Sequence, residues 1–305
     1  MKKIAVLMGG VSSEREVSLM SGKNIAEALS SLGKYEVASV VLDEESLDAM
    51  PKDVDAAYIA LHGGWGENGG AQEALDRLAI PYTGPGAKAS RIAMDKVKTK
   101  LVLEYAGVKT AKWSLAEKDA KESPLPLPVV VKPPCDGSSV GISKVSKAED
   151  WPRAVAEAVK AQGGEGSVLV EEFIPGREMT VGIIDSHPLP AIEIVTKSGW
   201  YGYDEKYFSE ETRYPFLADS ANPADRRLEV ELKAAALAAY KACGARGVTR
   251  VDFRVAPDGG IYVLELNTSP GFTSHSLVPK SAMREGRTFA ETCDWILNSA
   301  TFDRQ

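Results

Sequence analysis

Residues 247–276 constrain the fold of this chain more than any other segment. Two strand-like runs, 250–256 and 261–266, flank the turn-rich tetrapeptide PDGG, so we expect an antiparallel hairpin with those four residues as its loop. Pairing Ala256 with Ile261 separates apolar from polar side chains, and a slip of one residue would bury carboxylates. One face is then apolar and consists of Val251, Phe253, Val255, Tyr262, Leu264 and Leu266.

The other face of the predicted hairpin is polar. The same register places Asp252 opposite Glu265 and Arg250 opposite Asn267. Two carboxylates directly opposite each other destabilise a bare hairpin, and a divalent cation between them removes that repulsion. Asp252, Glu265 and Asn267 offer only oxygen donors, which favours a hard ion such as Mg2+ or Mn2+.

A solvated polar face is the alternative interpretation of this hairpin. The sequence NTSPGFTSHS at 267–276 favours the metal site, because it supplies backbone N–H groups, hydroxyls and small residues for an anionic substrate. Mg2+ held by few carboxylates usually completes its shell with nucleotide phosphates.

Length, charge and cysteine content exclude several classes of protein. A chain of 305 residues is expected to form two or three domains. The net charge of −7, without a basic block, argues against binding to nucleic acid or an anionic membrane. Three widely spaced cysteines indicate a reducing compartment, and no apolar run approaches the ~20 residues of a membrane span. We therefore expect a soluble cytoplasmic protein.

The first third of the chain has the pattern of a parallel α/β unit. Strand-like runs at 3–8, 37–42 and 56–61 alternate with helical sequence, and Ser12 or Ser13 can cap the first helix. No GxGxxG motif follows the first run, so a dinucleotide site is not supported.

The third strand leads directly into the glycine-rich loop HGGWGENGG. Loops at the carboxyl ends of parallel strands are where α/β sheets bind ligands, which makes His62 and Glu67 candidate site residues. A turn with an incidental histidine is the alternative.

The middle third predicts a phosphate-binding loop. One helix is expected at 87–107, then a proline-rich surface connection at 108–128 and a strand at 129–132 that ends in a lysine. Successive N–H groups in the following loop, PPCDGSSVGIS, can cradle phosphate oxygens, although the Walker A pattern is absent. A surface hairpin is the alternative. A helix at 149–161 and a strand at 167–173 follow.

The last third adds a long loop and three helices around the hairpin. Strand pattern returns at 179–196, and 197–216 is polar and aromatic without a sustained period. A loop of this length in a compact enzyme usually acts as a lid. Helices are expected at 223–243, from about Ser281, and at 288–300.

These motifs together resemble one enzyme family. R-x-D followed by E-x-N-T-x-P-G resembles the ATP-grasp ligases, and ELNTSPGFTSHSLVP resembles the D-alanine–D-alanine ligases among them. The resemblance spans nearly the whole chain. Four further segments resemble other signatures of the family: GGVSSEREVSLMSG at 9–22, HGGWGENG at 62–69, PYTG at 81–84 and WYGYDEKY at 200–207.

The resemblance implies an α/β (α+β) ATP-grasp fold and a reaction. It implies an N-terminal parallel α/β domain at 1–93, a central subdomain at 94–178 and a C-terminal subdomain at 179–305, with a lid at about 198–214. The last two would sandwich ATP. The implied activity is the joining of two D-alanines through a D-alanyl phosphate, for peptidoglycan precursors, by a cytoplasmic homodimer that uses ATP and two Mg2+ or Mn2+ ions.

The resemblance also assigns substrate residues. Glu14 matches the carboxylate that holds the ammonium of the first D-alanine, and His62 matches the histidine near its carboxylate. Lys206 would meet the γ-phosphate or the carboxylate of the second D-alanine, which Ser276 and the backbone of Leu277 would also bind.

The ATP residues follow from the same resemblance. Lys96 and Lys132 match the phosphate lysines, and Glu171 matches the residue that takes the purine amine. Ile174 is the expected backbone contact to adenine, and Glu178 the expected ribose contact.

The hairpin itself would carry the metal and the oxyanion. Asp252, Glu265 and Asn267 match the metal ligands of the family. Arg250 and the N–H of Gly271 match the donors that meet the tetrahedral oxyanion.

A hydrogen-bonded link between the domains is also implied. Tyr207 would bond Ser138, which in turn meets Glu14 over the substrates. The general base stays open between Tyr207, acting through Ser138, and His62.

Three positions depart from the family pattern, namely Asn68, Gly202 and Asp204. The last two leave the closed contacts of the lid undefined. Tyr207 favours D-alanine over D-lactate as the acceptor, so a D-alanine–D-lactate ligase is the weaker alternative.

Other classes make different predictions. A glutathione synthetase-like enzyme or a biotin-dependent carboxylase subunit would share the three metal ligands but lack the SEREVSLMSG and HGxxGE pair. A non-catalytic nucleotide-binding regulator would lack a metal ligand or a phosphate lysine, and the sequence retains all of them.

Overall fold

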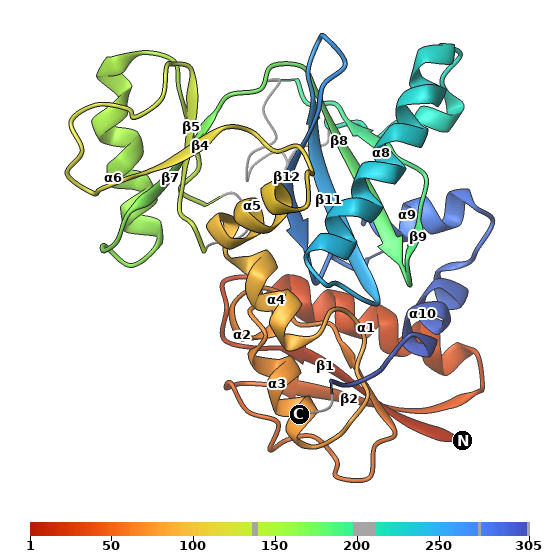
Figure 1. Cartoon of the computed structure of the whole chain (residues 1–305). Coiled ribbons are helices and arrows are strands. Elements are labelled where there is room, and N and C mark those ends of the chain that lie inside the picture. The colour runs from red at the N-terminus through yellow and green to blue at the C-terminus, as the bar shows by residue number, and fades with distance from the viewer. Residues whose placement is uncertain (136–139, 198–210, 274–275, 304–305) are drawn as a thin grey trace.

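The described residues form one parallel and two antiparallel sheets (Figure 1). The structure is a computed structural model that describes residues 1–135, 140–197, 211–273 and 276–303. This mixed architecture confirms the predicted α/β (α+β) class. Within the described ranges, no helix is both long and apolar enough to cross a membrane.

The parallel sheet comes from the first part of the chain. Its strands have the order β2-β1-β3, and they are β1 (Lys2–Gly9), β2 (Tyr35–Leu42) and β3 (Ala56–Ile59). Strand β3 is buried throughout and β1 along most of its length, which explains their continuous apolar sequences. The helices of this part are α1 (Arg15–Ser31), α2 (Gly64–Glu67), α3 (Gly70–Arg77) and α4 (Ala87–Met94).

The helix predicted as one element after residue 87 is in fact two, α4 and α5 (Lys96–Tyr105). Asp95 interrupts it, because its backbone is extended and its carboxylate accepts the N–H of Lys98 at 3.0 Å, as an N-cap does. The interruption makes Lys96 the first residue of α5. Its own N–H donates to the carbonyl of Pro134 at 2.9 Å, which ties Lys96 to the loop after β5.

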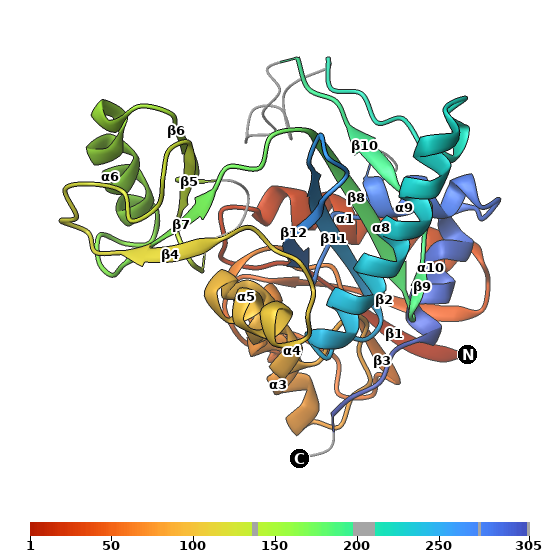
Figure 2. The same ribbon diagram turned by 45° about the horizontal axis from the view of Figure 1, so that its top comes forward.

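The central sheet is antiparallel, with the order β4-β7-β5-β6. Its elements are β4 (Trp113–Ala116), β5 (Val129–Lys132), β6 (Ser143–Val145), β7 (Val168–Glu172), the short 3-10 helix Ala148–Asp150 and α6 (Trp151–Ala161). Figures 1 and 2 show this sheet and α6 standing apart from the other two sheets. The sequence analysis missed β4 and β6. Strand β4 lies in the segment interpreted as a surface connection, yet Trp113 pairs with Glu171 on β7.

The third sheet is antiparallel and has the order β10-β8-β11-β12, with β9 pairing to β8. Its elements are β8 (Arg177–Ile184), β9 (His187–Pro188), β10 (Ile192–Ile194), the 3-10 helix Leu217–Asp219, α8 (Pro223–Ala242), β11 (Val248–Val255) and β12 (Ile261–Asn267). Helix α8 buries Leu232 and Ala236 in the same core as Phe253 of β11. The central strands β8 and β11 thereby share one core with α8.

The β11–β12 hairpin has the predicted register at its open end. Asp252 pairs with Glu265 and Arg250 with Asn267. Near the turn the prediction was wrong, because Val255 rather than Ala256 pairs with Ile261.

A three-residue loop and a bulge explain the difference. The loop is 257–259, in which Gly259 has φ +87°, the residue type that such a loop requires. The register then shifts by one between Asp252 and Phe253. Val263 consequently enters the core, while Tyr262 and Leu264, predicted there, are only half-buried.

The end of the chain packs on its beginning. Helix α9 (Leu277–Arg284) begins four residues before the predicted Ser281, and α10 (Phe289–Asn298) follows. Helix α10 lies beside α1 in both views (Figures 1 and 2). The hydroxyl of Tyr35 donates to Asp294 at 2.6 Å, so the C-terminal helix is anchored to β2.

Candidate active site

Arg250 and Asp252 form the centre of the polar face of the hairpin. The guanidinium donates to the carboxylate twice, from Nε to Oδ1 at 2.9 Å and from Nη2 to Oδ2 at 2.7 Å. Thr180 on β8 donates its hydroxyl to Oδ1 at 2.6 Å. These hydrogen bonds orient Asp252, which is 7% exposed and lies directly opposite Glu265.

Glu265 and Asn267 connect this face to its surroundings. The ammonium of Lys96 lies 3.6 Å from Oε2 of Glu265, and Oδ1 of Asn267 accepts the N–H of Ser269 at 3.0 Å. Carboxylate and amide oxygens suit a hard divalent cation. Over the described ranges no group of three or more His, Cys, Asp or Glu is placed to hold a metal ion.

His62 lies under the segment that follows the hairpin. Its Nδ1 is 2.9 Å from the carbonyl of Ser269 and its Nε2 is 3.0 Å from the hydroxyl of Ser21. A carbonyl only accepts, so Nδ1 carries the proton and Nε2 accepts from Ser21. The hydroxyl of Ser21 in turn accepts the N–H of Phe272 at 3.2 Å. Burial lowers the pKa of His62. The neutral imidazole therefore links the loop 62–70 to the residues after β12 through its hydrogen bonds.

Glu67 lies close to two other acids, Glu14 and Glu265. Burial, together with the nearby carboxylates of Glu14 and Glu265, raises the pKa of Glu67 to about 8, although Arg250 opposes the shift. At neutral pH its carboxyl group is therefore mostly protonated. Glu67 also lies 3.9 Å from Nδ1 of His62, which places both sequence candidates of this loop in the same site.

Glu14 lies on the same side as this loop. A Cβ added to Gly63 would come within 2.9 Å of Oε2 of Glu14, so the carboxylate lies directly against the loop. The predicted serine cap of α1 is wrong, because Glu14 itself is the N-cap and makes no side-chain cap bond. The Ser12 hydroxyl instead accepts the N–H of Glu14 at 3.2 Å and donates to the carbonyl of His62.

A tight turn follows the hairpin and leads into α9. The N–H of Thr273 donates to the hydroxyl of Ser276 at 2.9 Å, and the N–H of Ser276 donates to the carbonyl of Thr273 at 3.0 Å. A Cβ at Gly271 would lie 3.3 Å from the hydroxyl of Ser276. The turn brings Gly271, Ser276 and the N-terminus of α9 at Leu277 together, and a helix N-terminus favours a carboxylate or phosphate.

Three charged side chains meet in the central sheet. Glu171, which is 2% exposed, contacts Lys132 through Oε2 and Lys100 through Oε1, the latter at 2.6 Å. Burial pushes the pKa of Glu171 upward, but the two ammonium groups outweigh it and hold the pKa below its usual value. Sequence reasoning found Lys132 and Glu171 and missed Lys100, whose helical position carries no signal of burial.

Arg254 organises the segment after β7. Its Nε donates to the carbonyl of Ile174 at 3.1 Å, its Nη2 to the carbonyl of Gly176 at 2.8 Å, and its Nη1 to Glu178 at 3.2 Å. One residue of β11 thus fixes both the backbone and the acid predicted to contact the nucleoside. Sequence reasoning missed Arg254 because the contacts are far apart in the chain.

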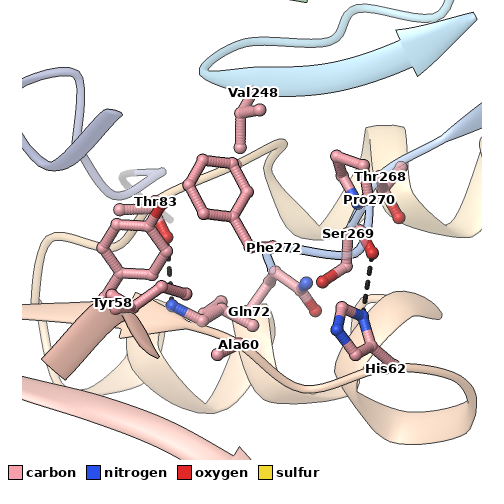
Figure 3. A pocket seen from close by; sticks show the side chains of 13 residues that line it. Tyr58, Ala60, His62, Gln72, Thr83, Val248, Thr268, Ser269, Pro270 and Phe272 are labelled. Carbon is pink, nitrogen blue, oxygen red and sulfur yellow. Dashed lines mark hydrogen bonds between the residues drawn. The ribbon is translucent and has the colours of Figure 1, made fainter. Parts of the chain in front are cut away.

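A small cavity lies beside His62 (Figure 3). Its volume is about 20 Å³, which is room for one water molecule. Tyr58 and Gln72 line it, and in the described ranges the hydroxyl of Tyr58 and Oε1 of Gln72 are buried without a hydrogen-bond partner. The cavity lies between residues of the parallel sheet and the Thr268–Phe272 segment, and it is too small for a substrate.

Several predicted residues lie outside the described ranges. They are Ser138, Lys206, Tyr207, Gly202 and Asp204. The other predicted site residues are described, and they come from all three sheets, the segments that follow their strands and the first residues of α5 and α9.

Comparisons with known proteins agree with this arrangement. Residues 99–298 match the family model for the C-terminus of D-Ala–D-Ala ligase. The D-alanine–D-alanine ligase of Bordetella petrii is 41% identical over 98% of this chain and 92% of its own length. That of Syntrophotalea carbinolica is 44% identical over 98% of this chain and 96% of its own length.

Solved structures give the same result. A D-alanine–D-alanine ligase from Bacillus anthracis in complex with ATP is 34% identical and superposes with a TM-score of 0.82, over 98% of this chain and 97% of that one. The VanG D-Ala:D-Ser ligase of Enterococcus faecalis is 27% identical, with a TM-score of 0.82 over 97% and 98%. The chain belongs to the D-alanine–D-alanine ligase family.

Proposed function

We propose that the protein joins two molecules of D-alanine into D-alanyl-D-alanine and converts ATP to ADP and phosphate. One observation carries this beyond family membership: Lys96 reaches Glu265, which lies directly opposite Asp252. A cation suited to phosphate and two acids suited to a metal thus share one face.

The first step activates a poor electrophile, the carboxylate of the first D-alanine, by transfer of a phosphoryl group. Lys96 and Lys132 would bind ATP phosphates and offset their charge. Asp252, Glu265 and Asn267 fit a hard cation and would hold two Mg2+ or Mn2+ ions, which neutralise charge on the phosphoryl group. Glu14 would bind the ammonium of this D-alanine. His62, neutral and bonded on both nitrogens, supports the substrate loop rather than acting as a base.

The second step is attack by the amine of the second D-alanine on the acyl phosphate. Arg250 and the N–H of Gly271 are proposed to stabilise the tetrahedral oxyanion, a contribution of ~10²–10³-fold per donor in other enzymes. Ser276 and the first N–H groups of α9, at Leu277, would bind the acceptor carboxylate. Lys206 and the link from Tyr207 through Ser138 to Glu14 remain proposals from the sequence.

The nucleoside would bind between the central and third sheets. Glu171 is proposed to accept the purine amine, the backbone of Ile174 to contact adenine and Glu178 to bind the ribose. Through the described ranges, the N–H of Ile174 makes no hydrogen bond within the chain, which suits such a contact.

The remaining parts of the proposal follow the family. We propose domain limits at 1–93, 94–178 and 179–305, since each sheet draws its strands from one of these ranges, except that β8 begins two residues before the last limit, at Arg177. A cytoplasmic homodimer that makes dipeptide for peptidoglycan precursors is proposed on the same basis.

Mass detection of the product tests the proposal directly. The purified chain, D-alanine, ATP and Mg2+ should give D-alanyl-D-alanine and one ADP per dipeptide. Parallel reactions with D-lactate or D-serine added at equal concentration should still give the D-alanine dipeptide as the main product. Equal turnover with L-alanine, or main products that contain D-lactate or D-serine, would refute the substrate assignment.

A further inference from the structure

Lys100 is a buried lysine whose hydrogen-bonding capacity is fully used within the protein. Its side chain is 1% exposed, and its ammonium lies 2.8 Å from the hydroxyl of Thr110, 3.1 Å from the carbonyl of Ala111 and 2.6 Å from Oε1 of Glu171. An ammonium group has three protons, so three acceptors exhaust it. Lys100 cannot reach for a phosphate without leaving buried acceptors unsatisfied.

Lys132 contacts the same carboxylate but is placed differently. It ends β5, directly before the glycine-rich loop predicted to cradle phosphates. Glu171 is its ion-pair partner in the part of the chain that the structure describes. If Lys132 turns toward a phosphate, Glu171 loses one of its two counter-ions. A buried carboxylate without a counter-ion becomes protonated.

We propose that Lys100 is a positioning residue for nucleotide specificity. It keeps Glu171 ionised after Lys132 has moved to the phosphates, and the ionised carboxylate makes the site select a 6-aminopurine over a 6-oxopurine. The inference rests on the proposed function, because it takes Glu171 as the residue that faces the purine.

The selectivity follows from donor and acceptor chemistry. A carboxylate only accepts hydrogen bonds, so it pairs with the amino group of adenine and repels the carbonyl oxygen of a 6-oxopurine. A protonated carboxyl group can donate to that carbonyl, and the discrimination is lost. Each carboxylate oxygen has two lone pairs, so Oε1 of Glu171, which lies 2.6 Å from the ammonium of Lys100, still retains a lone pair for a ligand.

The test compares ATP with ITP, which carries a carbonyl in place of the amino group and an N1–H in place of the unprotonated N1 of adenine. We would measure kcat/KM for both nucleotides, with saturating D-alanine and Mg2+, for the wild type, K100M, E171Q and K100M/E171Q. K100M should raise the ITP/ATP ratio of kcat/KM by about tenfold or more, the range expected for a hydrogen bond to a charged group. E171Q, whose amide both donates and accepts, should raise the ratio similarly, and the double variant should add nothing further.

Two controls separate specificity from stability. K118M removes an exposed lysine of the same domain that pairs with Glu165, and it should leave the ratio unchanged. T110A removes one acceptor of Lys100 but keeps its charge, so it should lower thermal stability without changing the ratio.

The outcomes are distinct. If K100M lowers kcat/KM for both nucleotides equally, Lys100 only supports the fold and the inference fails. If E171Q leaves the ratio unchanged, Glu171 does not read the purine and the inference fails as well. If K100M does not fold, the comparison of E171Q with K100M/E171Q still decides, because the double variant lacks the buried unpaired charge. The inference then requires that the double variant has the same kcat/KM as E171Q for both ATP and ITP. Absence of any D-alanine-dependent ADP release in the wild type would instead refute the proposed function.

Discussion

Arg250 and Asp252 form a bidentate ion pair although they lie only two residues apart on β11. The pair keeps a buried acid compensated beside Glu265, which lies opposite. The guanidinium thus covers the oxygens that we assign to a metal ion, and we propose that binding of that ion releases Arg250 toward the substrate.

Replacing Glu265 tests the metal face. E265Q keeps the shape of the side chain and removes the charge that a divalent cation needs, so turnover should fall by orders of magnitude while the circular dichroism spectrum and melting temperature stay close to those of the wild type. D258N, at the turn of the same hairpin, is the control and should retain activity because an amide oxygen can still accept the N–H of Gly260. Near-normal turnover of E265Q would contradict the metal assignment.

Arg254 provides a test of the nucleoside segment. R254M removes three hydrogen bonds, two of them to the carbonyls of Ile174 and Gly176. Because hydrogen bonds to charged groups typically contribute about 1.5–3 kcal/mol, the KM for ATP should rise about tenfold or more, with little change in the KM for D-alanine. R153M, on an exposed face of α6, should change neither. An equal rise in both KM values for R254M would point to general unfolding instead.

The hairpin shows which parts of the structure could be predicted from the sequence alone. Polar alternation predicted that Asp252 opposes Glu265, because a carboxylate on the apolar face would have been costly. The bulge that moves Val263 into the core could not be predicted in this way, since Val263, Leu264 and Tyr262 are all acceptable core residues and only packing against α8, α4 and α5 chooses among them. The loop length then follows from the bulge.

Residues whose partners lie far away in the sequence were also not predicted. Lys100, Thr180 and Arg254 act through contacts with residues 71, 72 and 80 positions away, and no local pattern marks them. Strand β4 was missed for a similar reason, because its partner β7 lies beyond a whole helix. The break at Asp95 was in principle readable, since aspartate is a preferred N-cap, but the apolar pattern continued across it.

The cap at Asp95 leads to a prediction about stability and nucleotide binding. D95A removes the acceptor for the N–H of Lys98 and should lower the free energy of unfolding by about 1 kcal/mol, measured by urea denaturation. It should also raise the KM for ATP, because Lys96 begins the helix that Asp95 caps. D95N retains a side-chain oxygen and should behave like the wild type in both measurements. An unchanged KM for ATP in D95A would show that Lys96 is held by its bond to Pro134 alone.

Glu67 predicts a pH dependence of stability. Its pKa is raised to about 8 in the fold by burial and by the carboxylates of Glu14 and Glu265, with Arg250 opposing, whereas in the unfolded chain it is about 4.3. At a pH between these two pKa values, the folded state binds more protons than the unfolded state. The contribution of Glu67 to stability is therefore fully present below the pKa of the unfolded chain and is lost as the pH rises through the pKa of the folded state.

E67Q removes this titration and keeps the shape of the side chain. Without metal or nucleotide, the variant should gain stability relative to the wild type as the pH rises from about 5 to 8, by up to about 1.4 kcal/mol per pH unit. Urea denaturation at several pH values measures the difference, and E16Q, which changes an exposed glutamate in the first turn of α1, serves as the control with a flat difference. A flat difference for E67Q as well would mean that Glu67 is ionised in the fold, and that the acids behind the hairpin are better compensated than their burial implies.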